Sequence, residues 1–96
     1  VKVLPLSAKF VEYGDRVAKL LRAAGLRAQH DDSDEKLGYK IRKAELEKVP
    51  YALVLGGREE ESGSVGVRKR IDGDLGTMSV EAFIERLQGE VAEKAR

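Results

Sequence analysis

The sequence contains no cysteine and a single histidine, His30. Without thiols the chain has no disulfide framework and no cysteine nucleophile, and it cannot build a metal site from several histidines and cysteines. A lone histidine at the end of a strand is typically a surface or packing residue rather than a catalytic base. These absences disfavour a stand-alone enzyme. A chain without cysteine also suits a reducing compartment, so we expect a cytoplasmic protein.

Long apolar runs and a large excess of charge are also missing. No run approaches the roughly 20 residues of a membrane-spanning helix, and no signal peptide pattern is present, so we expect no membrane partner. The net charge is +1, so a nucleic-acid site would have to be a local patch. The 96 residues, 42% hydrophobic and 36% charged, fit one globular domain spanning 1–96. Val1 already lies in a strand-like run without an initiator methionine, so we expect a fragment of a longer protein.

The common phosphate and calcium motifs are incomplete. Gly56 and Gly57 follow an apolar run, but neither of the glycine-rich phosphate-loop patterns is present. The acidic stretch DDSDE at 31–35 lacks the calcium-loop pattern, because Lys36 stands where a ligand is needed. Acidic residues before a helix stabilise its positive N-terminal end instead. We therefore expect no metal site in this chain.

Apolar periodicity and turn residues predict an α/β domain with a mixed sheet and helices packed against it. Strands are expected at residues 1–6, 26–30, 51–57 and 64–70, and helices after Ser7, over 35–48 and after Ser79. Helices separate the first three strands, which favours parallel pairing. The fourth strand follows a short link at 58–63, so we expect it to pair antiparallel with the third. The IDGD stretch at 71–74 predicts a turn before a short fifth strand.

One set of basic residues lies on the expected second helix. Its members are spaced i, i+4 and i+7 beside an apolar stripe: the cations are Lys36, Lys40 and Lys43, and the stripe is Leu37, Ile41 and Ala44. Tyr39 lies near the cations and offers a ring for stacking. Such a charged stripe is most often a solvated helix face.

A second set lies on the fourth strand. Arg68 and Arg70 share a strand face with Gly66, while Val65 and Val67 point the other way. Edge strands also carry cations to discourage aggregation, so this pattern alone does not require a ligand. From the residues alone we predict a small α/β domain with a candidate RNA-binding face.

The same stretches carry a family resemblance. EKLGYKIR at 35–42, KVPY at 48–51, the G-x-R-E-x-E-x-G-x-V-x-V-R-x-R block at 56–70 and D-L-G-x-M at 74–78 resemble the C-terminal anticodon-binding domains of threonyl-tRNA synthetases, class II enzymes. The resemblance covers essentially the whole chain. It implies a five-stranded mixed sheet flanked by three α-helices. It also implies that the domain holds the anticodon loop of threonine tRNA and reads its second and third bases, G and U.

The resemblance assigns roles to particular residues. The base-binding positions are Glu59, Arg68, Asp34 and Lys36, and the loop- and phosphate-binding positions are Gly38, Tyr39, Lys40, Arg42 and Arg70. A carboxylate accepts hydrogen bonds from the N–H donors of guanine, and a guanidinium donates to the carbonyls of uracil. Phosphate contacts position the RNA without reading its sequence. We also infer why position 38 is a glycine: a nucleotide passes close to the backbone there, and a side chain would obstruct it.

Two residues depart from the family pattern. Asp34 stands where asparagine is frequent, so a contact that needs the amide donor is lost. Glu60 stands where an apolar residue is common, and it adds an acid beside the expected RNA face.

The resemblance also implies partners that lie outside this chain. ATP and zinc would belong to an absent catalytic domain, and the parent would be a homodimeric threonine–tRNA ligase. Within the chain we expect no catalytic residue and no cofactor, and we expect no DNA partner. The alternative is a protein-interaction or regulatory domain that keeps this fold without binding tRNA. The presence of both Glu59 and Arg68 favours tRNA binding over that alternative.

Overall fold

A computed structural model describes residues 1–33, 35–70 and 73–94, with side chains described up to residue 90. Within these ranges, five strands form one sheet, accompanied by four α-helices and a 3-10 turn. In chain order the elements are β1 (Lys2–Pro5), the 3-10 turn η1 (Ala8–Phe10), α1 (Val11–Ala23), β2 (Gln29–His30), α2 (Leu37–Leu46), β3 (Tyr51–Leu55), α3 (Gly57–Ser62), β4 (Ser64–Lys69), β5 (Gly73–Ser79) and α4 (Val80–Lys94). No helix in the described ranges is long and apolar enough to cross a membrane.

The sheet is mixed, as the order of elements predicts. Its strands lie in the order β2-β1-β3-β4-β5. β1 pairs in parallel with both β2 and β3, whereas β4 pairs antiparallel with β3 and β5. The expected five-stranded mixed sheet is therefore confirmed, with β3 at its centre.

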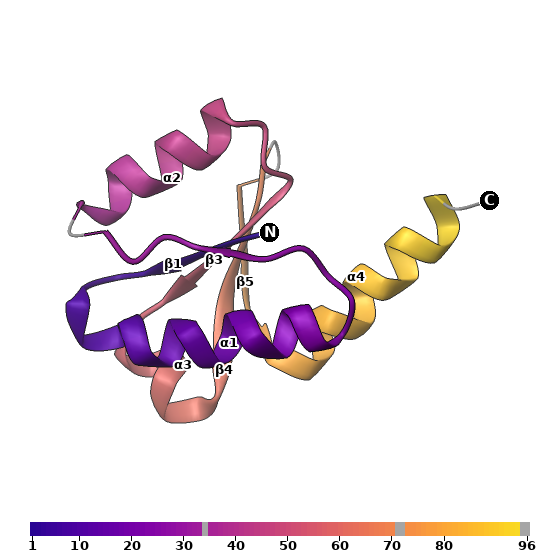
Figure 1. The fold of residues 1–96 in the computed structure, drawn as a ribbon, viewed down its shortest axis with the longest axis horizontal. Coiled ribbons are helices and arrows are strands. Elements are labelled where there is room, and N and C mark those ends of the chain that lie inside the picture. The colour runs from indigo at the N-terminus through magenta and orange to yellow at the C-terminus, as the bar shows by residue number, and fades with distance from the viewer. Residues whose placement is uncertain (34, 71–72, 95–96) are drawn as a thin grey trace.

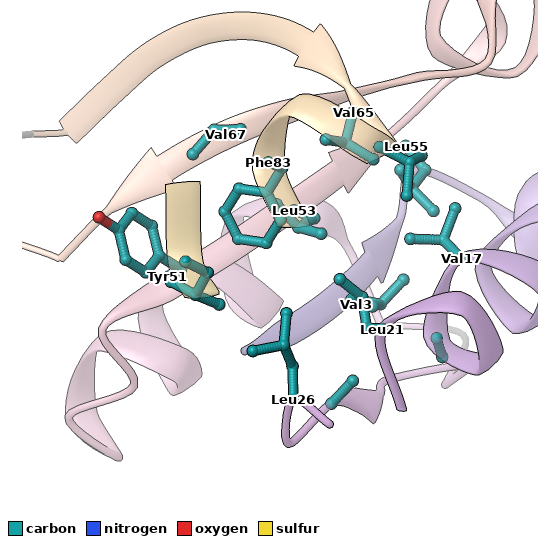
Figure 2. Packing of buried hydrophobic residues seen from close by; sticks show 14 of the residues in the cluster. Val3, Val17, Leu21, Leu26, Tyr51, Leu53, Leu55, Val65, Val67 and Phe83 are labelled. Carbon is teal, nitrogen blue, oxygen red and sulfur yellow. The ribbon is translucent and has the colours of Figure 1, made fainter. Parts of the chain in front are cut away.

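The two faces of the sheet are covered differently. α1 and α4 pack on one face, and α2 lies over the other (Figure 1). The main core forms under α1 and α4 from alternate strand residues, among them Val3, Leu53, Leu55, Val65 and Val67, which are fully buried (Figure 2). The ring of Phe83 meets that of Tyr51 edge-on, with the ring centres 5.5 Å apart. The remaining strand residues face α2, on the side that carries the candidate site.

Turn and capping residues mark the ends of two helices. Gly25 follows α1 with φ +84°, the left-handed conformation that favours glycine after a helix. The hydroxyl oxygen of Ser79 accepts a 3.1 Å hydrogen bond from the Ala82 N–H and caps α4. Ser7 precedes η1, but its side chain makes no capping hydrogen bond. α2 is shorter than the expected helix and begins after Lys36, whose backbone is extended.

Three expectations about the elements need correction. The expected link at 58–63 contains the short helix α3, which ends at Gly63 with φ +67°. The described residues therefore contain four α-helices rather than the three expected. β2 has only two residues, and β5 has seven rather than being short. Of the expected turn at 71–74, residues 71–72 lie outside the described ranges and Gly73 already belongs to β5.

Candidate RNA-binding site

A hollow of about 220 Å³ opens on the α2 side of the sheet. Its walls come from α2, β3, α3, β4 and β5. The lining residues are Leu37, Ile41, Val54, Glu59, Gly66, Arg68, Asp74, Gly76 and Thr77. The structure thus brings together Glu59 and Arg68, the two residues expected to read bases, although they lie on different elements.

The short helix α3 positions Glu59 over the sheet. The Glu59 side chain is half-buried, and its carboxylate lies between the backbones of Gly56 and Gly66. A Cβ atom added at Gly66 would lie 3.4 Å from Glu59 Oε1, and one added at Gly56 would lie 3.6 Å from Oε2. The added Cβ at Gly66 would also lie 3.2 Å from the Val54 carbonyl oxygen, a tight contact. The absence of a side chain at Gly66 therefore keeps the floor of the hollow open beside the carboxylate.

Arg68 enters the hollow from β4. Its cross-strand neighbours are Ala52 on β3 and Asp74 on β5, and it faces the same side of the sheet as Gly66. The residue is half-buried, and no hydrogen bond or ion pair within the described part of the chain occupies its guanidinium. Its donors are therefore available to a ligand.

The sequence interpretation missed two polar residues of the hollow, Asp74 and Thr77. Both lie on β5 and are the cross-strand partners of Arg68 and Gly66, respectively. Asp74 Oδ1 accepts a 2.7 Å hydrogen bond from the Gly76 N–H. The D-L-G-x-M motif at 74–78 contains both residues, so the motif was the available signal, but the interpretation assigned it no role in binding.

Lys40 is not exposed together with Lys36 and Lys43, so the basic stripe expected on α2 is incomplete. Only 2% of the residue is exposed, and its Nζ donates hydrogen bonds to the carbonyl oxygens of Pro5, at 3.3 Å, and Asp31, at 3.2 Å. Lys40 therefore belongs to the inward face of α2, together with the buried Ala44. The structure therefore places the Lys40 ammonium inside the fold rather than on the surface, where the expected phosphate contact would lie.

Asp31, whose backbone carbonyl accepts from Lys40, also carries a carboxylate with a shifted pKa. Burial acts to raise the pKa of Asp31. Hydrogen bonds from the hydroxyl and N–H of Ser33, and the charge of Lys40, outweigh burial and lower the pKa overall. The Asp31 carboxylate, in the turn that leads toward α2, therefore stays anionic at neutral pH.

The other described residues expected to contact RNA do not line the hollow. Lys36, Tyr39 and Arg42 are exposed on α2 or just before it. Arg70 is exposed at the end of β4, where it lines with Arg68 a second, very small hollow of about 10 Å³ under α2. Asp34 lies outside the described residues. Lys36, Arg42 and Arg70 are therefore cations exposed to solvent.

Gly38 lies in the first turn of α2 with open space around it. A Cβ atom added there would meet no atom within 4 Å. The fold therefore does not require glycine at this position for steric reasons.

The hollow combines charges of both signs. Two carboxylates, Glu59 and Asp74, flank the single guanidinium of Arg68. This arrangement offers hydrogen-bond acceptors and donors side by side, which suits the edge of a planar polar ring. Across the described side chains, no three histidine, aspartate or glutamate residues gather in a way that could hold a metal ion.

Comparison with known proteins gives the chain a family. Residues 1–90 match the family described as the anticodon binding domain. The chain is 50% identical over 95 residues to the threonine–tRNA ligase of Caldanaerobacter subterraneus, and 48% identical over 94 residues to that of Clostridium acetobutylicum. These alignments cover 99% and 98% of this chain but only 15% of each relative. The chain therefore spans a small part of the length of these curated relatives.

Solved structures agree with the fold. The RNA binding domain of threonyl-tRNA synthetase from Cryptosporidium parvum matches with a TM-score of 0.87 and 28% identity, over 92% of this chain and 22% of that chain. Histidyl-tRNA synthetase from Nostoc matches with a TM-score of 0.84 and 15% identity, over 94% of this chain and 22% of that chain. At this low identity the second likeness concerns the fold alone.

Proposed function

We propose that this chain, which belongs to the anticodon binding domain family, holds the anticodon loop of threonine tRNA and reads its second and third bases, G and U. The family match and the threonine–tRNA ligase relatives confirm the resemblance found in the sequence motifs. The identity of the bases is what the family resemblance implies, and the polar side chains of the hollow suit the edges of G and U. Single-stranded loop bases are read through their Watson–Crick edges.

The observation that carries the proposal is the placement of Glu59 and Arg68 in one hollow. The Glu59 carboxylate accepts from the N–H donors on the guanine edge, and the Arg68 guanidinium donates to uracil carbonyls. The exposed cations Lys36, Arg42 and Arg70 contact the phosphates of the loop in this proposal. Base reading and phosphate binding thus fall to different side chains.

The proposal extends to the protein that would contain this domain. The relatives are threonine–tRNA ligases, and we propose a parent of this kind that acts in the cytoplasm as a homodimer. As the sequence resemblance implies, its catalytic domain would bind ATP and zinc. In such a protein the domain positions the tRNA for aminoacylation. The catalytic step uses no residue of this chain.

The test is binding of the chain to a threonine anticodon stem-loop and to a control loop with G and U exchanged. Both are measured at two salt concentrations, because affinity from phosphate contacts alone falls with salt regardless of sequence. We expect the native loop to bind more tightly. Arg68→Ala should remove most of this preference, at a cost of about 1.5–3 kcal/mol typical of a hydrogen bond to a charged group.

A matched control is Arg27→Ala. Arg27 is exposed and lies beside Val1 and Leu87, outside the hollow, so its removal changes the net charge equally. It should leave the preference intact. Equal, salt-sensitive binding of the unsubstituted chain to both loops would contradict base reading. No binding at all would favour the alternative of a protein-interaction domain.

A further inference from the structure

β5 contains a bulge beside the hollow. Val67 pairs with Gly76 and Arg68 pairs with Asp74, so Leu75 has no partner residue on β4. In a regular strand, residues three apart face opposite sides of the sheet. The extra residue instead lets Asp74 and Thr77 both face the hollow, while Leu75 packs against the core. Bulges that re-aim a side chain are frequent next to functional sites.

The bulge also fixes the conformation of Asp74. Gly76 has φ +87°, which other residues rarely adopt. Its N–H donates to Asp74 Oδ1 at 2.7 Å. One carboxylate oxygen thus holds the bulge, and the other keeps lone pairs for the hollow, since an ionised carboxylate accepts about four hydrogen bonds.

We propose that Asp74 is a specificity-determining residue that accepts an N–H from a base in the hollow; this rests on the proposed function of the site. With Glu59 and Arg68 it makes the hollow net anionic, which repels a phosphate. A neutral base edge that places N–H donors next to a carbonyl satisfies all three side chains. Guanine and uracil have such edges, whereas adenine and cytosine present an unprotonated ring nitrogen, an acceptor that a carboxylate cannot satisfy.

The test uses Asp74→Asn. Asparagine keeps the shape and the oxygen that accepts from Gly76, and it replaces the second acceptor by an amide donor. We expect the melting temperature to stay close to that of the unsubstituted chain. Affinity for the G-U stem-loop should fall roughly 10- to 100-fold, as expected for losing a hydrogen bond to a charged group. Discrimination at one of the two base positions should disappear, as measured with loops in which each base is replaced separately.

Glu12→Gln provides a control for charge. Glu12 is exposed on α1, on the opposite side of the sheet, so its change removes one negative charge without touching the hollow. Binding is measured below the lower melting temperature, so that a destabilised variant is still folded. If the unsubstituted chain prefers G-U and Asp74→Asn keeps both affinity and preference, the role of Asp74 is refuted while the proposed function stands. If the unsubstituted chain shows no preference, both proposals fail.

Discussion

At the scale of single residues, the buried ammonium of Lys40 is a structural tie. It links the end of β1 to the turn after β2, through the carbonyls of Pro5 and Asp31. A buried carbonyl that loses its donor is costly because it also lacks water. The charge pattern of α2 predicted a solvated lysine, because a sequence records the charge of a residue but not the carbonyls that neighbouring strands place beside it.

Lys40→Met tests this tie. Methionine fills a similar volume but leaves two carbonyls without their donor, so we expect the free energy of unfolding to fall by about 1–3 kcal/mol. Urea unfolding measures the change. Lys43→Met is the control, since Lys43 is exposed on the same helix and should change stability by less than about 0.5 kcal/mol. Equal losses of stability in the two variants would show that Lys40 contributes no more to the fold than the exposed Lys43 does.

Gly38 offers a test of recognition separate from folding. Because open space surrounds it, Gly38→Leu should fold normally and gain up to about 1 kcal/mol from better helix propensity. If a nucleotide passes over this turn, the same variant should bind the G-U stem-loop at least about tenfold more weakly, which corresponds to 1.4 kcal/mol. Thermal unfolding and stem-loop titration together separate the two effects. Unchanged binding would mean that the glycine is incidental to recognition.

At the scale of elements, α1 packs on the strands through the small surface of Gly14. A Cβ atom added there would lie 2.5 Å from His30 Nε2 and 3.0 Å from Pro5 Cγ. The His30 nitrogen is buried and has no hydrogen-bond partner in the described part of the chain. Close approach of helix and strand therefore accounts for a glycine inside this helix, and His30 is a packing residue as the sequence indicates.

Gly14→Ala should accordingly destabilise the domain although alanine favours helices. Overpacking costs about 1–3 kcal/mol, which exceeds the gain of about 1 kcal/mol from helix propensity. Gly89→Ala is the matched substitution in α4, where an added Cβ meets nothing within 4 Å; it should raise the free energy of unfolding by about 0.5–1 kcal/mol. Thermal unfolding of the two variants distinguishes the outcomes. A stabilised Gly14→Ala variant would show that His30 moves aside without cost.

The elements also show what the sequence could predict. The alternation in β4 predicted which of its residues face the core, because burial acts directly on these residues. α3 was missed because its six residues contain no buried side chain and so have no apolar period. Asp74 and Thr77 were missed because a bulge depends on how β5 pairs with β4. Pairing is a property of two strands, and one strand's sequence does not specify it.

At the scale of the whole molecule, the two faces of the sheet have separate tasks. The face under α1 and α4 holds the main core, and the face under α2 holds the hollow. The family resemblance predicted Glu59 and Arg68 as a pair without specifying their surroundings. Because the net charge is only +1, the proposed RNA site must depend on a few local cations rather than on a globally basic surface.

Alternation along β4 makes the domain respond differently to two kinds of genetic change. Val65 and Val67 face the core, and Gly66 and Arg68 face the hollow. A point substitution at one of these positions alters either stability or recognition. An insertion or deletion of one residue within β4 exchanges the two faces, burying arginine and exposing valine, so it abolishes both at once. Lineages of this domain should therefore vary β4 by substitution and keep its length constant.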